Sequence, residues 1–168
     1  DDGITEEELV GMVEQARTEG GLDEHEGDLI RNAIEFNDLE VSEILTPRVD
    51  LVAAEEGSTM EEVASLFVES GYSRIPIYHE TIDNIVGVVH EKDFYAARYR
   101  GETMLSHLKS PVFYTTGNTK ISELLRILQK NKAHMAIVVD EYGGTEGIAT
   151  LEDILEELVG EIWDEHDE

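Results

Sequence analysis

Apolar residues recur at helical spacing over the first forty residues of the chain. They fall every three or four positions in two stretches that Gly20-Gly21 separates, which predicts two amphipathic helices. Thr5 with Glu8 forms an N-terminal capping signature for the first helix, and Asp23 with Glu26 opens the second. The predicted apolar faces comprise Leu9, Met12, Val13 and Ala16 in the first helix and Leu29, Ile30, Ala33 and Ile34 in the second.

From Val41 onward short apolar strands alternate with helices, and the order strand, helix, strand, strand, helix occurs twice. The first round combines strands at 51–54, 74–78 and 85–89, a capping box of Ser58 and Glu61, a helix from Met60 to Gly71, a turn at Asp83-Asn84, and a helix from about Glu91. The second round combines strands at 112–114, 135–139 and 147–149, a turn at 141–144, a helix over 121–128, and a closing helix with Ile154 and Leu158.

Corresponding positions of the two rounds lie at a nearly constant distance along the chain. Met60 corresponds to Ile121, Ile75 to Ala136 and Asp93 to Asp153, at offsets of 61, 61 and 60 residues. This regularity is typical of an internal duplication. A single small sheet leaves one face uncovered, so two such units must pack on each other.

We therefore predict an α+β fold of tandem β-α-β-β-α repeats related by a pseudo-two-fold axis, preceded by a helical N-terminal segment. The expected division is a helical segment over 1–40, a first repeat over 41–104, a second repeat over 105–160, and an acidic C-terminal tail over 161–168. Packing about such an axis would create two related clefts between the repeats, where ligands usually bind.

Composition narrows the possible partners. The 168 residues contain 12 Lys+Arg and 39 Asp+Glu, a formal charge of −27 that disfavours nucleic acid and anionic membrane surfaces. The absence of cysteine excludes disulfides and thiolate metal sites, and the six histidines show no ligand spacing, so we predict no metal site. Apolar runs of only a few residues predict no membrane span. No catalytic arrangement of residues is visible, so an enzyme is not expected, and a chain that begins at Asp1 suggests a fragment of a longer protein.

The turns into the closing helices carry the candidate chemistry. In the second repeat Thr150 stands at the N-cap position, and Asp153 follows three residues later on the same face. Unpaired N–H groups at a helix N-terminus suit a phosphate, a hydroxyl can donate to a phosphate oxygen, and a carboxylate can accept from ribose hydroxyls. Together these groups favour a nucleotide, although Thr-x-x-Asp is also an ordinary helix cap. In the first repeat His90 replaces the threonine and Glu91 adds negative charge, so we predict one good site and a weaker one around Asp93.

Five motifs extend the comparison to most of the chain: ILTPR (44–48), SRIPIY (73–78), GVVHEKD (87–93), VVDEYGGT (138–145) and GEIWDEHD (160–167). The repeated unit resembles a CBS (cystathionine-β-synthase-type) motif, and the pair resembles a Bateman module. Within that class the chain is similar to the magnesium/cobalt efflux CorC and hemolysin C-like family.

The resemblance implies a regulatory module on the cytoplasmic side of a membrane, attached to a membrane transport domain for divalent cations. Similar modules form homodimers and bind adenine nucleotides, commonly ATP with magnesium or AMP, without chemistry. It further implies that Asp153 holds the ribose, Thr150 the phosphates, and residues of the other repeat the base. Those residues are Tyr72, Ser73, Ile75 and Pro76, and the neighbouring Arg74 is the cation best placed to offset phosphate charge.

Two other functions remain open from the sequence. The chain can be a dimerisation scaffold whose clefts are filled by side chains and bind no nucleotide. Alternatively, its acidic surface can sense Mg²⁺ directly, which predicts stabilisation by the ion alone. Trp163 and Ile162 form a large apolar pair within the acidic C-terminus, for which packing is the expected role.

Overall fold

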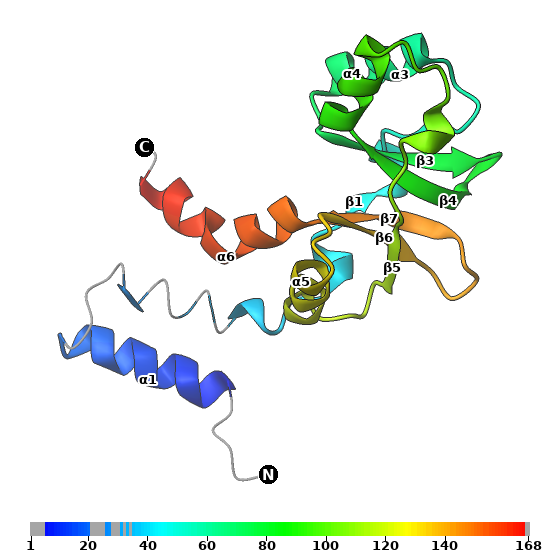
Figure 1. The fold of residues 1–168 in the computed structure, drawn as a ribbon. Helices are drawn as coiled ribbons and strands as arrows, with labels where there is room; N and C mark the ends of the chain where they lie inside the picture. Colours follow the sequence, from blue (N-terminus) through cyan, green and yellow to red (C-terminus); the bar gives the residue numbers. More distant parts are fainter. Residues whose placement is uncertain (1–5, 21–25, 28–30, 32, 34, 167–168) are drawn as a thin grey trace. The chain divides into compact units, whose positions relative to one another are not determined.

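The structure, a computed structural model, describes residues 6–20, 26–27, 31, 33 and 35–166 (Figure 1). Helix α1 (Glu6–Thr18) confirms the first predicted N-terminal helix. Gly20 follows it with φ 82°, a left-handed conformation that suits glycine and ends the helix. The capping residue Thr5 and the predicted opening of the second helix at Asp23 lie outside the described residues.

The rest of the chain confirms the predicted order of elements in both repeats (Figure 1). The first repeat contains β2 (Ala54–Glu55), α3 (Met60–Ser70), β3 (Arg74–His79), β4 (Thr81–His90) and α4 (Glu91–Tyr99). The second contains β5 (Phe113–Thr116), α5 (Ile121–Lys130), β6 (Met135–Val139), β7 (Thr145–Thr150) and α6 (Leu151–His166). A short strand β1 (Thr46–Pro47) and three 3-10 helices, η1 (Val41–Glu43), η2 (Arg48–Asp50) and η3 (Leu105–His107), precede or connect these elements.

The predicted capping box of the first repeat is wrong by one residue. The cap of α3 is Thr59, whose hydroxyl accepts the N–H of Glu62 at 3.1 Å, while the Glu62 carboxylate accepts the N–H of Thr59 at 3.0 Å. Both pairs fit the same sequence signature, but the N–H of Ser58 closes a turn onto the carbonyl of Glu55. The two hydrogen bonds between Thr59 and Glu62 hold the pKa of the Glu62 carboxyl below its usual value.

Three further boundaries differ from the sequence prediction. The hairpin of the first repeat turns at Glu80, with φ 65°, and β4 runs through the predicted turn at Asp83-Asn84. The first strand is restricted to β2, whose residues pair with Ile77 and Tyr78 of β3. Helix α6 continues to His166, so the backbone of most of the predicted tail is helical.

The strands form two sheets that each belong mainly to one repeat. The three-stranded sheet has the order β2-β3-β4, with β2 parallel and β4 antiparallel to β3. The four-stranded sheet has the order β1-β7-β6-β5, with β5 parallel to β6. In both repeats a parallel pair is therefore followed by a third strand beside its second member, β4 beside β3 and β7 beside β6.

Each repeat also receives a strand residue from the initial segment of the other repeat. Thr46 and Pro47 pair antiparallel with Ile148 and Gly147 of β7. Ser110 forms the corresponding antiparallel bridge with Val88 of β4, through N–H to carbonyl bonds of 2.8 and 3.0 Å. This reciprocal strand exchange joins the two repeats through backbone hydrogen bonds.

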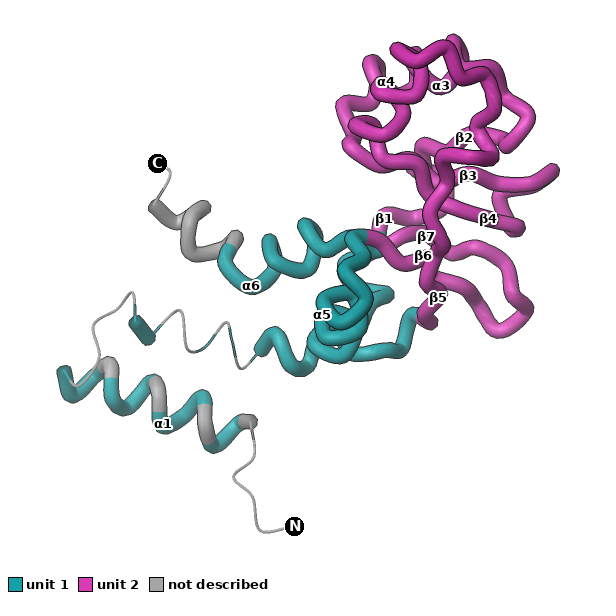
Figure 2. Tube along the Cα trace, viewed as in Figure 1, with its two compact units in different colours: residues 1–45, 117–134, 149–168 teal, residues 46–116, 135–148 magenta. Residues whose placement is uncertain are grey.

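The chain divides into two compact units that do not coincide with the repeats (Figure 2). Unit 1 consists of residues 1–45, 117–134 and 149–168, and unit 2 of residues 46–116 and 135–148. Within unit 1, helices α5 and α6 contact each other, and the segment around η1 bonds to the start of α5. The N–H of Val41 donates to the carbonyl of Thr119 at 2.9 Å, and that of Ile121 to Leu39 at 3.0 Å.

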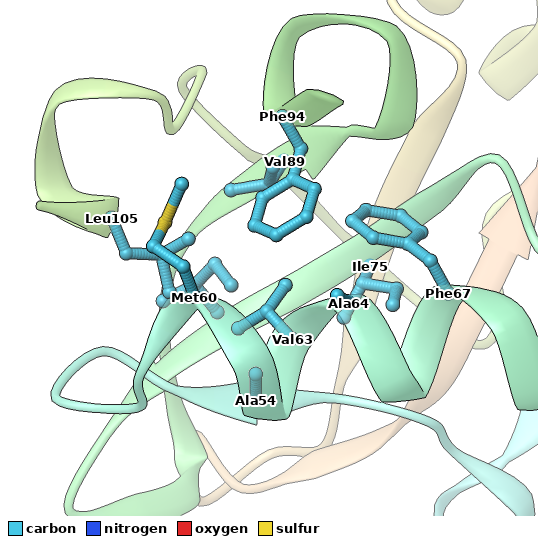
Figure 3. Packing of buried hydrophobic residues seen from close by; sticks show 10 residues of the cluster. Ala54, Met60, Val63, Ala64, Phe67, Ile75, Val89, Phe94 and Leu105 are labelled. Carbon is cyan, nitrogen blue, oxygen red and sulfur yellow. The ribbon is translucent and has the colours of Figure 1, made fainter. Parts of the chain in front are cut away.

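The core of unit 2 lies between α3, α4 and the β2-β3-β4 sheet (Figure 3). The rings of Phe67 and Phe94 meet with centroids 5.3 Å apart, and Ile75, Val63 and Val89 pack beside them with no exposed surface. A second close contact lies at Gly87, where an added Cβ would come within 2.7 Å of the Cβ of Lys109. In the part of the chain that the structure describes, no helix is long and apolar enough to cross a membrane.

Candidate functional site

The start of helix α6 has the geometry that the sequence predicts for Thr150. This residue ends strand β7, and its hydroxyl oxygen accepts the backbone N–H of Asp153 at 3.1 Å. The N–H of Leu151 donates to the carbonyl of His134, directly before β6, at 2.8 Å. Thr150 and Asp153 are both half-buried, so their polar groups are held in place while part of each side chain is accessible.

These bonds decide which groups at α6 can contact a ligand. The amides of Leu151 and Asp153 already have partners within the chain, so the expectation of a helix start with unpaired N–H groups is wrong at these two positions. The Thr150 hydroxyl accepts one bond and keeps its own proton, which it can donate to a phosphate oxygen. The Asp153 carboxylate has acceptor capacity for vicinal hydroxyl groups.

The first turn of α6 is acidic, because it contains Glu152 beside Asp153. The imidazole Nδ1 of His134 lies 3.9 Å from a carboxylate oxygen of Glu152. This nitrogen is buried and makes no hydrogen bond within the described residues. An anion that approaches Thr150 therefore comes close to the carboxylates of Glu152 and Asp153, and the His134 imidazole lies near that of Glu152.

The corresponding helix start in the first repeat has the same backbone arrangement and a different side chain. The N–H of Glu91 donates to the carbonyl of Ser73 at 2.8 Å, as that of Leu151 does to His134. His90 has extended backbone angles, φ −89° and ψ 135°, but its side chain makes no capping hydrogen bond. Asp93 is exposed.

The residues predicted to contact the base lie on both sides of the start of β3. Tyr72 is 51% exposed and Ser73 is exposed, so their side chains are accessible. Arg74 is half-buried. The side chain of Ile75 belongs to the core of unit 2 and Pro76 is buried, so the accessible part of this segment lies at Tyr72 and Ser73.

The predicted site residues are divided between the two units. Thr150 and Asp153 belong to unit 1, whereas 72–76 and Asp93 belong to unit 2. Across the ranges that the structure describes, no group of three or more His, Asp or Glu residues is arranged to hold a metal ion. The side chain of Trp163 lies outside the described part.

Sequence reasoning missed a polar cluster of Arg48, Asp83, Asp140 and Thr145 within unit 2. The Arg48 guanidinium binds both carboxylate oxygens of Asp83, and this pairing lowers the pKa of Asp83 and raises that of Arg48. Arg48 and Thr145 each lie in a motif quoted above, and Asp83 lies in the wrongly predicted turn. No local signal pairs these residues, because the contacts of Arg48 with Asp83 and Thr145 span 35 and 97 residues of the sequence.

Comparison with known proteins identifies the class of this chain. The model of the CBS domain family matches residues 41–100 and again 105–160. The chain therefore belongs to the CBS domain family and contains a pair of CBS domains.

The more specific relatives point to one group within that family. Hemolysin C of Brachyspira hyodysenteriae is 40% identical over 147 residues, which cover 88% of this chain and 54% of that protein. The solved CBS domain of a bacterial CNNM/CorC family Mg²⁺ transporter is 39% identical with a TM-score of 0.85, covering 94% of this chain and 98% of that one. A structure of such a domain in complex with ATP is 43% identical with a TM-score of 0.72, covering 79% and 95%. The resemblance to the CorC and hemolysin C-like family is thus confirmed.

The curated relatives are longer than this chain. It spans about half of hemolysin C and about a quarter of a chloroplastic DUF21 domain-containing protein of Arabidopsis thaliana, to which it is 39% identical.

Proposed function

We propose that this CBS pair is a regulatory module, without catalytic activity, that binds an adenine nucleotide and controls a membrane protein for divalent-cation transport, such as magnesium or cobalt efflux. The observation that carries the proposal is the start of α6, where Thr150 keeps a hydroxyl proton for a phosphate and Asp153 supplies acceptors for a ribose. The ATP complex of a CBS domain 43% identical to this chain supports the choice of ligand.

The ligand is ATP or AMP, held through its ribose by Asp153 and through its phosphates by Thr150. Tyr72 and Ser73 provide accessible side chains for the base, and the buried Ile75 and Pro76 fix the strand that follows them. Because the chain carries a formal charge of −27, Mg²⁺ chelated by the phosphates would reduce the repulsion that a triphosphate meets. Arg74 would contribute in the same sense.

The two repeats differ in their capacity for this ligand. At the first-repeat position His90 replaces the threonine hydroxyl and its side chain makes no capping bond, and Glu91 adds charge of the wrong sign. We therefore assign the principal site to Thr150 and Asp153 and a weak or empty one to Asp93.

The family to which the chain belongs supports a proposal about its partners. We propose a homodimer on the cytoplasmic side of the membrane, with a membrane transport domain in the same polypeptide and no role for nucleic acid. Bound nucleotide can shift the transport domain only to the extent that it prefers one arrangement of the module.

Calorimetric titration with ATP, ATP with Mg²⁺, and AMP tests the site. Thr150→Ala should weaken binding at least about tenfold, because a hydrogen bond to a charged group contributes about 1.5–3 kcal/mol. Asp153→Ala should act in the same direction. His90→Ala and Asp93→Ala are the matched controls in the first repeat and should leave the affinity nearly unchanged.

Other outcomes select the other functions. Equal behaviour of wild type and the Thr150 and Asp153 variants would show that the site is assigned to the wrong residues. An intact dimer that binds none of these nucleotides would identify a scaffold. Thermal stabilisation by Mg²⁺ without nucleotide would identify a direct Mg²⁺ sensor, which the acidic composition favours as the second candidate.

A further inference from the structure

Thr145, the first residue of β7, is held by residues from two distant segments of unit 2. It is 3% exposed, and no other polar or charged residue of the described part is buried. Its N–H donates to Asp83 at 2.9 Å, its hydroxyl donates to the carbonyl of Ile82 at 2.8 Å, and its carbonyl accepts from Arg48 at 3.1 Å. All three polar groups of this buried residue are therefore satisfied by segments far away in the sequence.

Arg48 and Asp83 are in turn bound to each other. The two terminal nitrogens of the guanidinium donate to the two carboxylate oxygens of Asp83. One of them, Nη1, also donates to the Thr145 carbonyl. Only a planar, forked donor can make these three contacts at once. Asp140 lies near Arg48, and its carboxylate accepts the N–H groups of Tyr142 and Gly144 at 2.9 and 2.8 Å, which fixes the turn before β7.

The first repeat has a neutral counterpart of this arrangement. Ile85 of β4 corresponds to Thr145 at the offset of 60 residues, and its carbonyl accepts the hydroxyl of Tyr114 at 2.5 Å. The two side chains have similar places in the chain. Tyr114 comes shortly after Ser110, which bridges to β4, and Arg48 comes directly after β1, which pairs with β7. Each exchanged segment thus places one side chain against a carbonyl of the other repeat's closing strand. Only Arg48 also binds a carboxylate, that of Asp83 in the first repeat.

We propose that Arg48, Asp83 and Thr145 form a clasp that fixes strand β1 to the hairpins of both repeats, so that these three segments open and close as one unit. Of the four passages of the chain between unit 1 and unit 2, one lies directly before Thr46 and another directly after Ile148, within a few residues of Arg48 and Thr145. If the residues before Thr46 move, the clasp makes both hairpins move together with β1, so the change is not confined to 46–50. The clasp is independent of nucleotide binding.

Hydrogen–deuterium exchange of the full chain, without ligand, tests the clasp. Arg48→Lys keeps the charge but cannot span Asp83 and the Thr145 carbonyl together, and Asp83→Asn removes the charge with little change in shape. In both variants the amides of 46–50, 80–83 and 143–146 should exchange at least about tenfold faster, by a common factor, while peptides containing Ile75 and Phe94 keep their rates.

Two control variants separate the clasp from general stabilisation. Arg98→Lys makes the same substitution in the exposed ion pair of Arg98 with Glu61, and should leave all three segments unchanged. Tyr114→Phe removes only the hydroxyl that donates to the Ile85 carbonyl, and it should not change the exchange rates of 46–50 or 143–146. Equal acceleration across all of unit 2, different factors in the three segments, or no change in either clasp variant would overturn the proposal.

Discussion

The two repeats place their side-chain helix caps on opposite helices. In the first repeat α3 is capped by Thr59 within a full capping box, whereas His90 before α4 makes no capping bond. In the second repeat Lys120 before α5 makes none, whereas Thr150 caps α6. Since α4 forms without a hydroxyl in the same backbone setting, a helix can begin at this position without a side-chain cap.

The largest effect is expected from truncating the equivalent core side chains Phe94 and Ile154, both without exposed surface. Phe94→Ala should lower the free energy of unfolding by about 3–5 kcal/mol and Ile154→Ala by about 2–5 kcal/mol, because each leaves a cavity. Because strand exchange joins the repeats, each variant should show a single shifted transition in chemical denaturation. Two transitions, of which only one moves, would show that the repeats unfold separately.

Gly87→Ala comes next, and it tests the contact between β4 and the segment that crosses to it. The added Cβ would lie within 2.7–2.9 Å of three carbon atoms of Lys109, so overpacking should cost about 1–3 kcal/mol. Gly11→Ala is the control with the opposite sign, because nothing lies within 4 Å of that helical position and alanine should stabilise α1 by about 0.5–1 kcal/mol. Chemical denaturation measures both, and an unchanged midpoint for Gly87→Ala would contradict the close contact.

A smaller effect is expected from exchanging the caps themselves. Thr150→Ala should lower the free energy of unfolding by about 1 kcal/mol, because the N–H of Asp153 loses its acceptor. His90→Thr places a hydroxyl where α4 has none and should raise it by up to about 1 kcal/mol. Thermal melting of both variants sharpens the comparison, and changes of the same sign would show that the two helix starts are not equivalent.

The smallest effect concerns pH and contrasts the charged clasp with its neutral counterpart. The pKa of Asp83 is lowered from 3.8, mainly by Arg48 and then by the Thr145 amide, with Asp140 as the other nearby charge. A lowered pKa in the folded state means that the contribution to stability is present above about pH 4 and is lost as pH falls through the folded value. The melting temperature of wild type should therefore approach that of Asp83→Asn below pH 4, while its difference from Tyr114→Phe should not depend on pH in this range.

The order of the elements and the cap at Thr150 were predictable because both depend on local signals. Amphipathic spacing and the 60–61-residue offset define the repeats, and a hydroxyl three residues before a carboxylate defines the cap. The cap at Thr59 was missed because two overlapping signatures fit the same stretch, and the sequence alone does not rank them.

The remaining errors come from contacts between distant residues. Asp83-Asn84 is typical of a turn, but Asp83 is bound by Arg48, 35 residues away, and by Thr145, 62 residues away, and it stays in β4. The family resemblance implied that Ile75 and Pro76 contact the base, which stays a prediction, and the structure adds that the side chain of Ile75 lies in the core. Such pairings depend on tertiary structure, which periodicity does not encode.

The reciprocal pairing of Thr46 with Ile148 and of Ser110 with Val88 has a consequence for severed chains. A polypeptide cut between residues 100 and 105 would yield two halves, each with an uncovered strand edge and a detached segment that fits the edge of the other. Such halves should recombine when mixed, and either one alone should associate with copies of itself. Each repeat thus completes the sheet of the other.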